Sequence, residues 1–565
     1  MADYLDFKDA RCRDCYKCLR ECPVKAIAVR NHQARIIDER CILCGHCTVV
    51  CPQNAKVVHS ELDQVKALLA SGRKVVACVA PSYVSSFNLQ SFSIMQIALG
   101  KLGFSEVEEV AEGAQLVTEA YRQQMLSGEF RNYITSACPA ACRMIQHYYP
   151  SALKYLAPVV SPMIAHASMV RKRNPEAGIV FIGPCIAKKR EAADTQLIDQ
   201  VLTFEELQKW FDEAQIHLED ISEFNLPKAG GYANLAKAYP ISHGIITSFG
   251  KALPEGWSYM AVDGPDRCAD VLENIDSLDH VFIELNSCKD ACVSGPCSIA
   301  HSGGSVRATR DVREYVEKEK ATHPSEGPVE IDVDLTAAYP RLRLSNIPPT
   351  DKEITSILAR TGKFAPEDEL NCGACGYNTC REKAWAVYNG FADIEMCVPY
   401  MRKRAESMSY EIIRSNPDGV VVLDSDMNIV EINHKACELL GITAVDVKGC
   451  PASDYFGTSD YITVLGTGRP ILGQREFIPK TNQYVDLSIS LIKENHMLFG
   501  VLRDVTAKAN YEEKLHAVKL ETLETTDEVI KKQMRVAQEI ASLLGETTAE
   551  TKVALLKLKQ TLQAE

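Results

Sequence analysis

The sequence lacks the features that would tie it to a membrane or to nucleic acid. It has no uninterrupted apolar run of about eighteen residues, so we expect no membrane-spanning helix. Positive charge is not in excess: 75 acidic residues outnumber 62 basic ones, which gives a net charge of -13 and no general attraction to phosphate backbones or anionic lipid. The first residues, MADYLDFKDARC, contain no apolar core, so we expect no signal peptide and a cytoplasmic protein.

Cysteine, by contrast, is abundant, with 22 copies in 565 residues. Disulfides do not persist in a reducing cytoplasm, so metal ligation is the natural use of so many thiols. Sixteen of the cysteines fall into three spaced sets. The six left over are Cys78, Cys142, Cys268, Cys297, Cys437 and Cys450.

One cysteine pattern occurs twice within residues 1–60. Each copy reads C-x2-C-x2-C-x3-C-P, and the copies begin at Cys12 and Cys41. In two-cluster ferredoxins three thiolates come from one tight loop and the fourth comes from the other copy. Zinc knuckles are the alternative, although zinc sites seldom combine this spacing with a closing proline. We therefore assign one [4Fe–4S] cluster to Cys12, Cys15, Cys18 and Cys51, and a second to Cys22, Cys41, Cys44 and Cys47.

The remaining chain changes character several times, so we predict an α/β multidomain protein. Over 61–350, helical stretches alternate with short apolar runs that we expect to be strands: KVVACVAPSY, NYITSACPA, GIVFIGPC, HGIITS and HVFIEL. A cysteine-rich unit follows over 351–404. Residues 405–508 lose the clustered cysteines and form a separate small α/β module. Residues 509–565 contain no proline and favour a helical tail, interrupted near Gly545.

Three cysteine-bearing loops follow expected strands of the 61–350 region: TSACPAAC, FIGPCIAKKRE and FIELNSCKDACVSGPC. Together they resemble the signature segments of the [FeFe]-hydrogenase active-site domain. The resemblance implies a two-lobed domain with an H-cluster, in which a [4Fe–4S] cubane is joined to a diiron azadithiolate unit that carries CO and cyanide. The ligands that it implies are Cys138, Cys185, Cys288 and Cys292, with Cys292 bridging to the diiron unit.

The resemblance also gives roles to residues beside the diiron unit. Lys188 would contact one cyanide and Ser82 would donate to the other, while Ala80 and Pro81 would line the pocket. A buried cyanide-bearing site needs positive charge and hydrogen-bond donors, so these residue types suit the implied role.

The chain departs from the family where protons would move. Ala137 stands where catalytic members have a proton-relaying cysteine. Gly183 and Asn286 replace two methionines, so we expect space and an amide beside the diiron unit, with a water near Ala137 and Gly183 as a weak proton route. The family's paired glutamates have no clear counterparts, since Glu112 and Glu119 lack the usual spacing. Deleting one member of a proton relay slows a reaction by orders of magnitude, so we predict slow turnover.

A further set of four cysteines follows the spacing C-x2-C-x4-C-x16-C and comprises Cys372, Cys375, Cys380 and Cys397. Gly373 and Gly376 permit a tight loop around a cluster. The set resembles a small [4Fe–4S] module of iron–sulfur electron carriers and sensory hydrogenases, and a zinc site is the alternative. Its position predicts an extra electron exit or a redox relay toward the C-terminus.

Residues 405–508 resemble a PAS domain, on the run PDGVVVLDSDMNIVEINHKACELLG and the closing LRDVT. PAS modules dimerise and pass structural changes into a following helix, so Asp504 to Thr506 mark the expected handover. The PAS ligand is unknown, and we interpret His434 as a surface or helix-capping residue rather than a haem ligand. Leucines and valines at helical spacing make a coiled coil plausible in the tail. No kinase, phosphatase or DNA-reading motif follows, so any output must pass to a partner protein.

The sequence therefore predicts a sensory [FeFe]-hydrogenase with an H-cluster and three additional [4Fe–4S] clusters. It would exchange H2 with protons slowly and reversibly. The expected partners are a redox protein such as ferredoxin, the H-cluster maturation enzymes, an unknown signalling protein and a second copy of the chain. Two alternatives stay open: a fast catalytic hydrogenase linked to ferredoxin, and a non-catalytic iron–sulfur assembly protein of hydrogenase-like fold.

Overall fold

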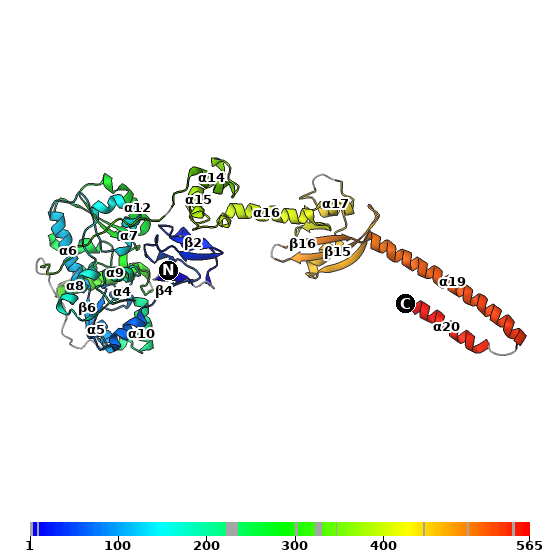
Figure 1. Ribbon diagram of the computed structural model, residues 1–565, viewed down its shortest axis with the longest axis horizontal. Coiled ribbons are helices and arrows are strands. Elements are labelled where there is room, and N and C mark those ends of the chain that lie inside the picture. Colours follow the sequence, from blue (N-terminus) through cyan, green and yellow to red (C-terminus); the bar gives the residue numbers. More distant parts are fainter. Residues whose placement is uncertain are drawn as a thin grey trace. The chain divides into compact units, whose positions relative to one another are not determined.

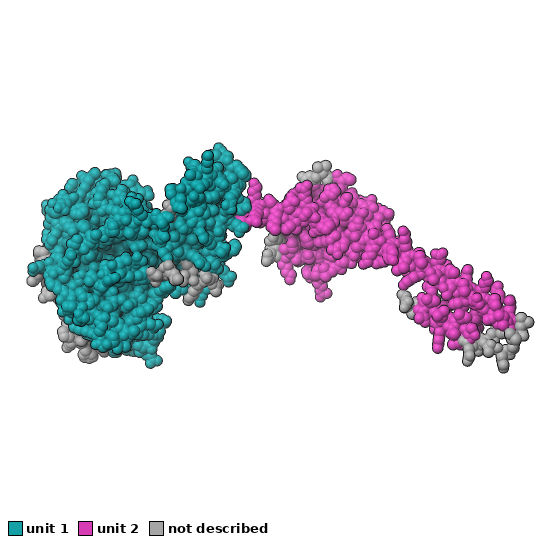
Figure 2. All heavy atoms as spheres, viewed as in Figure 1, with its two compact units in different colours: residues 1–400 teal, residues 401–565 magenta. Residues whose placement is uncertain are grey.

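The structure of the chain is a computed structural model (Figure 1). Two parallel sheets form the centre of its hydrogenase-like region, residues 61–350. The chain divides into two units, residues 1–400 and 401–565, which are described separately (Figure 2). The structure describes residues 4–7, 11–221, 235–299, 303–322, 330–345, 347–443, 447–493, 496–544 and 548–564.

The first sheet has the strand order β6–β5–β8–β9 and is parallel throughout. Its strands are β5 Val75–Val79, β6 Glu106–Glu109, β8 Gly178–Gly183 and β9 Gln200–Thr203. The two central strands are buried along their whole length, which explains why VVACV and GIVFIG are continuously apolar rather than alternating. Buried residues of the surrounding helices share one core with this sheet. These helices are α3 Leu62–Ala70, α4 Tyr83–Ser86, α5 Phe92–Lys101, α8 Pro162–Arg173, α9 Ala187–Thr195, α10 Phe204–Glu213 and α13 Gly304–Thr322.

The second sheet has the order β10–β11–β7 and is also parallel. Its strands are β7 Tyr133–Ile134, β10 Ser258–Asp263 and β11 Val281–Asn286. The accompanying helices are α6 Ala111–Leu126, α7 Pro139–Tyr148, α11 Gly244–Ser248 and α12 Pro265–Asn274. Loops that leave the carboxyl ends of parallel strands are the usual place for ligands, and here the loops after β7, β8 and β11 carry the cysteines.

The run HGIITS, which we expected to be a strand, is helix α11 instead. His243 has left-handed backbone dihedrals with φ 64°, and its carbonyl accepts from both the backbone N–H and the hydroxyl of Thr247, at 2.8 and 2.7 Å. A Cβ on Gly244 would collide with the Ala238 carbonyl, so only glycine fits this turn. A short apolar run does not by itself distinguish a strand from a buried helix, and the strand prediction was wrong here for that reason.

The N-terminal cysteine region contains two small antiparallel pairs, β1 Leu5–Phe7 with β4 Lys56–Val58, and β2 Ile27–Arg30 with β3 Gln33–Ile36. Two four-residue helices, α1 Lys17–Arg20 and α2 His46–Val49, follow the second cysteine of each repeat. The region packs tightly on the sheets, since a Cβ on Gly45 would meet Pro296 at 2.5 Å. Tyr148 of α7 donates its hydroxyl to the Arg40 carbonyl at 2.7 Å.

The cysteine-rich unit after residue 350 lies against this N-terminal region. It contains α14 Asp351–Ala359 and α15 Cys380–Tyr388, and α16 Val398–Ser415 follows its last cysteine. Val29 donates its N–H to the Phe391 carbonyl at 3.0 Å, and Arg20 donates to the Ala374 carbonyl at 3.2 Å. The Arg40 guanidinium lies 5.1 Å from the ring centre of Trp385. Backbone and cation–π contacts therefore fix the unit on the region of the repeated cysteines.

The second unit begins with an antiparallel sheet of order β13–β12–β16–β15–β14. Its strands are β12 Gly419–Leu423, β13 Ile429–Ile432, β14 Ile471–Ile478, β15 Gln483–Ile492 and β16 Met497–Asp504, with helices α17 His434–Leu440 and α18 Ser459–Thr467. One apolar core joins the sheet and both helices. His434 is exposed, and the residue that caps α17 is Asn433, whose side chain accepts from the Ala436 N–H at 2.9 Å.

Two helices follow the sheet: α19 Thr506–Leu544 begins two residues after β16 ends, and α20 is Thr548–Ala564. They contact each other, and Lys559 forms an ion pair with Asp527 at 2.6 Å. The predicted interruption near Gly545 lies outside the described residues. In the described part of the chain, no helix combines the length and the apolar character that a membrane span requires.

Candidate functional site

A cavity of about 90 Å³ lies where the loops after β5, β7, β8 and β11 converge. Three of the four cysteines that the sequence assigns to the cubane, Cys138, Cys185 and Cys292, line it. The fourth, Cys288, lies close enough to Cys185, Cys138 and Cys292 to interact electrostatically with their sulfur atoms. Topology thus brings together four thiols from three distant loops, and Cys292 is the one with an exposed side chain.

The chemistry of these thiols fits an iron–sulfur cluster. Burial raises the pKa of Cys185 to about 11, and burial followed by the neighbouring thiols raises the pKa of Cys288 well above its usual value. Four thiolates packed this closely are costly without cationic metal between them. Iron is such a metal, and all-thiolate ligation is the usual way that proteins hold a cubane.

The Ser82 hydroxyl fits a further group in the cavity. Ser82 is 1% exposed and lines the cavity, and its Oγ has no hydrogen-bond partner among the described residues. A buried hydroxyl without a partner costs free energy, so such an atom calls for an acceptor that the protein itself does not supply. Pro81 and Ala80 line the same wall. A cyanide in the cavity would satisfy the Ser82 hydroxyl.

Lys188 also reaches this cavity but is not free of partners. Its Nζ donates to Ser161 Oγ at 2.8 Å, to Glu191 Oε2 at 2.7 Å and to the Ala137 carbonyl at 3.4 Å. Burial lowers the pKa of Lys188, but the Glu191 carboxylate outweighs burial and the net shift is upward. The site therefore holds a fixed ammonium whose charge is balanced by Glu191.

The structure shows the surroundings of Ala137 and Gly183, the two positions that we connected with proton transfer. Ala137 lines the cavity and presents no ionisable side chain there. Gly183 leaves no space, contrary to our expectation, because a Cβ on it would lie 2.8 Å from the Phe181 ring and 3.1 Å from Ala80. The Phe181 ring occupies the space that a side chain at Gly183 would take, and Phe181 and Ala137 both line the cavity. The water that we expect near Ala137 and Gly183 stays a prediction.

Behind the cavity wall lies an acidic pair that the sequence analysis missed. Asn286, which lines the cavity, donates to Asp263 Oδ1 at 3.0 Å and to Glu284 Oε1 at 3.3 Å. Glu284 is fully buried, and burial, with a contribution from Asp263, raises its pKa to about 8. A glutamate inside the apolar strand FIEL was the available signal, since charged residues are rarely buried without a reason.

The glutamates of α6 do not reach this cavity. Glu119 accepts from Arg122 at 2.8 and 2.6 Å and from Gln123 at 2.9 Å, all on its own helix. Glu112 lies with Glu108 and His166. Neither residue is part of the cavity wall.

The repeated cysteine pattern has a matching backbone in its two copies. Three pairs of equivalent positions have left-handed backbone dihedrals in both copies. The pairs are Asp14 and Leu43, Tyr16 and Gly45, and Lys25 and Asn54. The fourth cysteine of each copy accepts a backbone N–H, from Ala26 to Cys22 at 3.3 Å and from Ala55 to Cys51 at 3.4 Å.

The fourth cysteines lie with the opposite copy. Cys51 lines one small cavity together with Cys12, Cys15 and Cys18. Cys47 lies close enough to Cys44, Cys41 and Cys22 to interact electrostatically with their sulfur atoms, so Cys22 lies with the second copy. Cys22, Cys41, Cys44 and Cys138 pack against one core, so the second group adjoins the site described above.

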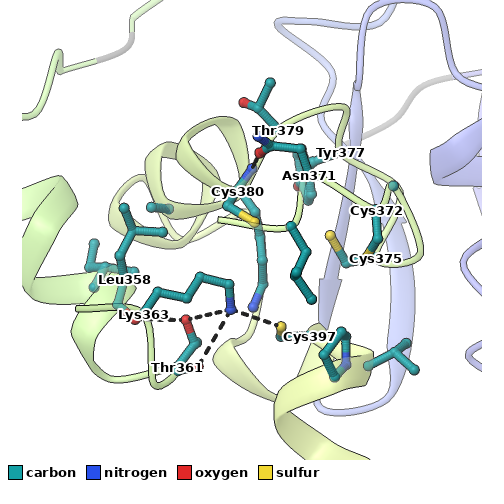
Figure 3. A pocket seen from close by; sticks show the side chains of 17 residues that line it. Leu358, Thr361, Lys363, Asn371, Cys372, Cys375, Tyr377, Thr379, Cys380 and Cys397 are labelled. Atoms are coloured by element: carbon teal, nitrogen blue, oxygen red, sulfur yellow. Dashed lines mark hydrogen bonds between the residues drawn. The ribbon is translucent and has the colours of Figure 1, made fainter. Parts of the chain in front are cut away.

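The third cysteine group lines a cavity of about 30 Å³ (Figure 3). Cys380 is the first residue of α15, and Cys397 immediately precedes α16. Two lysines, Lys363 and Lys383, share the cavity wall with the four cysteines. All-cysteine donors fit an iron–sulfur cluster or a zinc ion equally well on ligand type alone.

Comparison with known families agrees with this geometry. Residues 73–296 match the family model described as the iron only hydrogenase large subunit, C-terminal domain. That segment contains all four cysteines of the first site. We call residues 73–296 the hydrogenase domain, after the family model that they match. Residues 5–63 match a 4Fe-4S dicluster domain, 368–399 match the FeS family model, and 408–475 match the PAS fold.

Individual relatives of the hydrogenase domain are distant. Iron hydrogenase 1 of Clostridium pasteurianum is 27% identical over 217 residues, which is 33% of this chain and 38% of that protein. The NADP-reducing hydrogenase subunit HndD of Solidesulfovibrio fructosivorans is 24% identical over 257 residues, 39% of this chain and 44% of that protein. The chain thus spans about two fifths of the length of these curated relatives. The periplasmic [Fe] hydrogenase large subunit of Nitratidesulfovibrio vulgaris is 26% identical over 364 residues, 52% of this chain and 85% of that protein.

Among solved structures, the [FeFe]-hydrogenase HydA1 of Chlamydomonas reinhardtii matches with a TM-score of 0.39 and 18% identity, covering 51% of this chain and 100% of that one. The PAS domain of an HTR-like protein from Haloarcula marismortui matches with a TM-score of 0.15 and 21% identity, covering 18% of this chain and 98% of that one. The assignment of the hydrogenase domain rests on the family model rather than on these likenesses.

Proposed function

We propose that the chain is a sensory [FeFe]-hydrogenase that interconverts H2 with protons and electrons slowly and reversibly, and that reports H2 or redox state through its third cluster and PAS domain. One observation carries the proposal: the Lys188 ammonium, an unpartnered Ser82 hydroxyl and three of the four predicted cysteine ligands line one cavity, with Cys288 close to those three, while Ala137 offers no proton carrier.

In this proposal Cys138, Cys185, Cys288 and Cys292 hold the cubane, and Cys292 also binds the diiron unit. The H-cluster supplies the H2 chemistry when it is bound. Ser82 Oγ would donate a hydrogen bond to one cyanide, and Lys188 Nζ would donate to the other in place of its 3.4 Å bond to the Ala137 carbonyl. Pro81 and Phe181 line the cavity and would keep water from its wall. Glu191 and Ser161 hold Lys188 in place, because both accept hydrogen bonds from its Nζ.

Slow turnover follows from the groups around Ala137. A relay needs an ionisable group within hydrogen-bond reach of the reacting centre, and a methyl group cannot serve. Glu284 holds a proton at neutral pH because its pKa is about 8. Asn286 lies between Glu284 and the cavity, and an amide donates a hydrogen bond without exchanging its own proton readily. We infer that this route passes protons poorly.

Electrons would travel through three further [4Fe–4S] clusters. The ligands of one are Cys12, Cys15, Cys18 and Cys51, those of the next are Cys22, Cys41, Cys44 and Cys47, and those of the last are Cys372, Cys375, Cys380 and Cys397. The second group adjoins Cys138. Tyr377 lies near both Cys375 of the third group and Cys22 of the second, so these two groups are close to each other. This arrangement supports a route from the hydrogenase domain through the second group to the third, with a ferredoxin-like protein as external partner.

The signalling half of the proposal rests on the second unit. A PAS domain followed directly by the long helix α19 supports transfer of a change from sheet to helix. Helices α19 and α20 expose apolar residues, among them Leu515, Val529, Val536, Val553 and Leu556. We propose that a second copy of the chain covers part of them and that the remaining output passes to another protein.

The proposal is tested on protein matured with the diiron unit by its maturation enzymes. Infrared bands of CO and cyanide should appear, and H2 oxidation should be measurable but slow. Protein that lacks these bands after maturation would be a non-catalytic iron–sulfur protein. Turnover on the order of thousands per second would mark a catalytic hydrogenase instead, since that rate requires an efficient proton path.

A further inference from the structure

Two buried lysines line the cavity of the third cysteine group, and Figure 3 labels one of them, Lys363. Lys363 is 8% exposed and Lys383 is 6% exposed. Lys363 Nζ lies 3.4 Å from Cys397 Sγ and also donates to Thr361 Oγ1 at 3.3 Å. Lys383 Nζ donates to the Ile394 carbonyl at 2.8 Å. Both ammonium groups are therefore fixed in the wall of the cavity.

Neither lysine forms an ion pair with a carboxylate within the described parts of the chain. The charged groups that act most strongly on Lys383 are Cys397, Cys375, Lys363 and Cys380. A buried ammonium without a counter-charge is strongly disfavoured, and two of them side by side are worse. Burial lowers the pKa of Lys383. A cluster held by four cysteine thiolates carries a net negative charge and would balance both ammonium groups.

Helix ends add positive charge at the same place. Cys380 opens the nine-residue helix α15, and Cys397 precedes the eighteen-residue helix α16. The N-terminal end of a helix carries a partial positive charge, so both helices favour negative charge at these cysteines.

The other two accessory groups have less buried positive charge around them. Lys25, near Cys22, is half-buried and donates to the carbonyls of Leu19 and Arg20. Lys56 is half-buried and acts on Cys18, Cys47 and Cys51, and the half-buried Arg143 acts on Cys41. The cations beside these two groups are therefore more exposed than Lys363 and Lys383. The helices that follow these cysteines, α1 and α2, have four residues each. Buried positive charge is thus concentrated at the third group.

We propose that the third cluster has the highest reduction potential of the three clusters outside the hydrogenase domain, so that it retains an electron that H2 delivers. Reduction adds one negative charge, which nearby ammonium groups and an N–H to sulfur bond stabilise. The delivery of electrons by H2 rests on the proposed function: oxidation of one H2 releases two protons and two electrons. One electron takes the cluster core from 2+ to 1+, and the other reduces a ferredoxin-type cluster or the external redox partner.

The experiment is a redox titration of the full chain, with its cubane clusters reconstituted but without the diiron unit, using dithionite and following reduced clusters by electron paramagnetic resonance. The accessory signals are those that persist in a variant with Cys185→Ser and Cys288→Ser, which removes the cubane of the hydrogenase domain. The first accessory signal to appear as the potential falls should be missing in a variant with Cys375→Ser and Cys380→Ser. Its persistence in that variant would place the highest potential elsewhere and overturn the proposal. A zinc-filled site, seen as zinc with iron for only two accessory clusters, would overturn it as well.

Lysine variants test the cause. Lys363→Met should move this first signal to lower potential, whereas Lys363→Arg, which keeps the charge, should leave it near the original value. Lys352→Met, an exposed lysine of α14, is the matched control and should cause no shift. Lys383→Met should shift the signal in the same direction as Lys363→Met, which keeps the test decisive if one variant binds its cluster poorly. An unchanged potential in both methionine variants would overturn the electrostatic explanation. Because the titrated protein carries no diiron unit, these outcomes do not depend on whether the matured chain turns over H2.

Discussion

The two sites with buried lysines differ in how each lysine charge is balanced. In the hydrogenase domain, Glu191 lies 2.7 Å from Lys188 Nζ, so the ammonium is neutralised by the protein before any cofactor binds. In the third cysteine group, Lys363 and Lys383 face sulfur atoms instead of carboxylates. A lysine that is paired with a carboxylate serves mainly as a positioned hydrogen-bond donor. A lysine without a carboxylate partner makes a more negative charge on a bound cluster more favourable.

The largest expected effect separates the two sites completely. Cys292→Ser should abolish attachment of the diiron unit and all H2 oxidation, because it removes the thiolate that we propose as the bridge. The paramagnetic signals of the three accessory clusters should stay as they are, which electron paramagnetic resonance on the reduced chain measures. Loss of those signals as well would show that the two sites are not independent.

The free energy of unfolding should fall more when Lys188 is replaced than when Lys363 is replaced. Lys188→Met leaves the buried Glu191 carboxylate without its partner, so we expect the free energy of unfolding of cluster-free protein to fall by about 2–3 kcal/mol. Lys363→Met removes a buried charge that has no carboxylate partner, so we expect no loss. Calorimetry of both variants measures this difference. The double variant Lys188→Met with Glu191→Gln is the control, and it should recover part of the loss.

Restoring the missing thiol should have a smaller effect on rate. Ala137→Cys should raise H2 oxidation by about tenfold in matured protein, because one relay group returns while Asn286 still separates Glu284 from the cavity. Steady-state assays measure the change, and Ala137→Ser is the size-matched control. Recovery to the rate of fast hydrogenases would show that the rest of the proton path is intact.

The smallest expected effect concerns pH and belongs to the hydrogenase domain alone. Burial raises the pKa of Glu284 from 4.5 to about 8, so between these values the folded chain holds a proton that the unfolded chain has lost. Stability from this group is complete below about pH 4.5 and is lost as pH rises toward 8. Glu284→Gln should flatten the decline between pH 5 and 8, measured by denaturant unfolding at several pH values. An equally steep decline in the variant would assign the pH dependence to another group.

Cysteine spacing predicted two ligand groups within residues 1–60, because the ligands of one cluster follow local loop geometry. The ligands at the cavity of the hydrogenase domain were implied by the family resemblance. The structure places Cys51 beside the first repeat and Cys22 beside the second, as the sequence predicted. It also brings Cys138, Cys185 and Cys292 to one cavity, which follows from the parallel strands that precede them.

Tertiary packing accounts for what the sequence left hidden. Phe181 fills the place beside Gly183 because its ring folds back over its own strand end, and no residue pattern shows this. Lys363 lies nine residues before Cys372 and meets Cys397 only after the chain has turned. The helix at HGIITS likewise depends on the His243 turn and on Gly244 against Ala238, not on the apolar residues themselves.

Cys397 is joined by a single peptide bond to the first residue of α16, a helix that ends four residues before the opening strand of the PAS sheet. Extra negative charge at this cysteine stabilises the first turn of the helix through the unpaired N–H groups at its start. Thermodynamic reciprocity then requires the converse: any event that frays this turn would make the cluster that we propose at Cys397 harder to reduce. A ligand of the sensory domain that loosened the helix would therefore govern how readily electrons settle there, so information would pass in both directions.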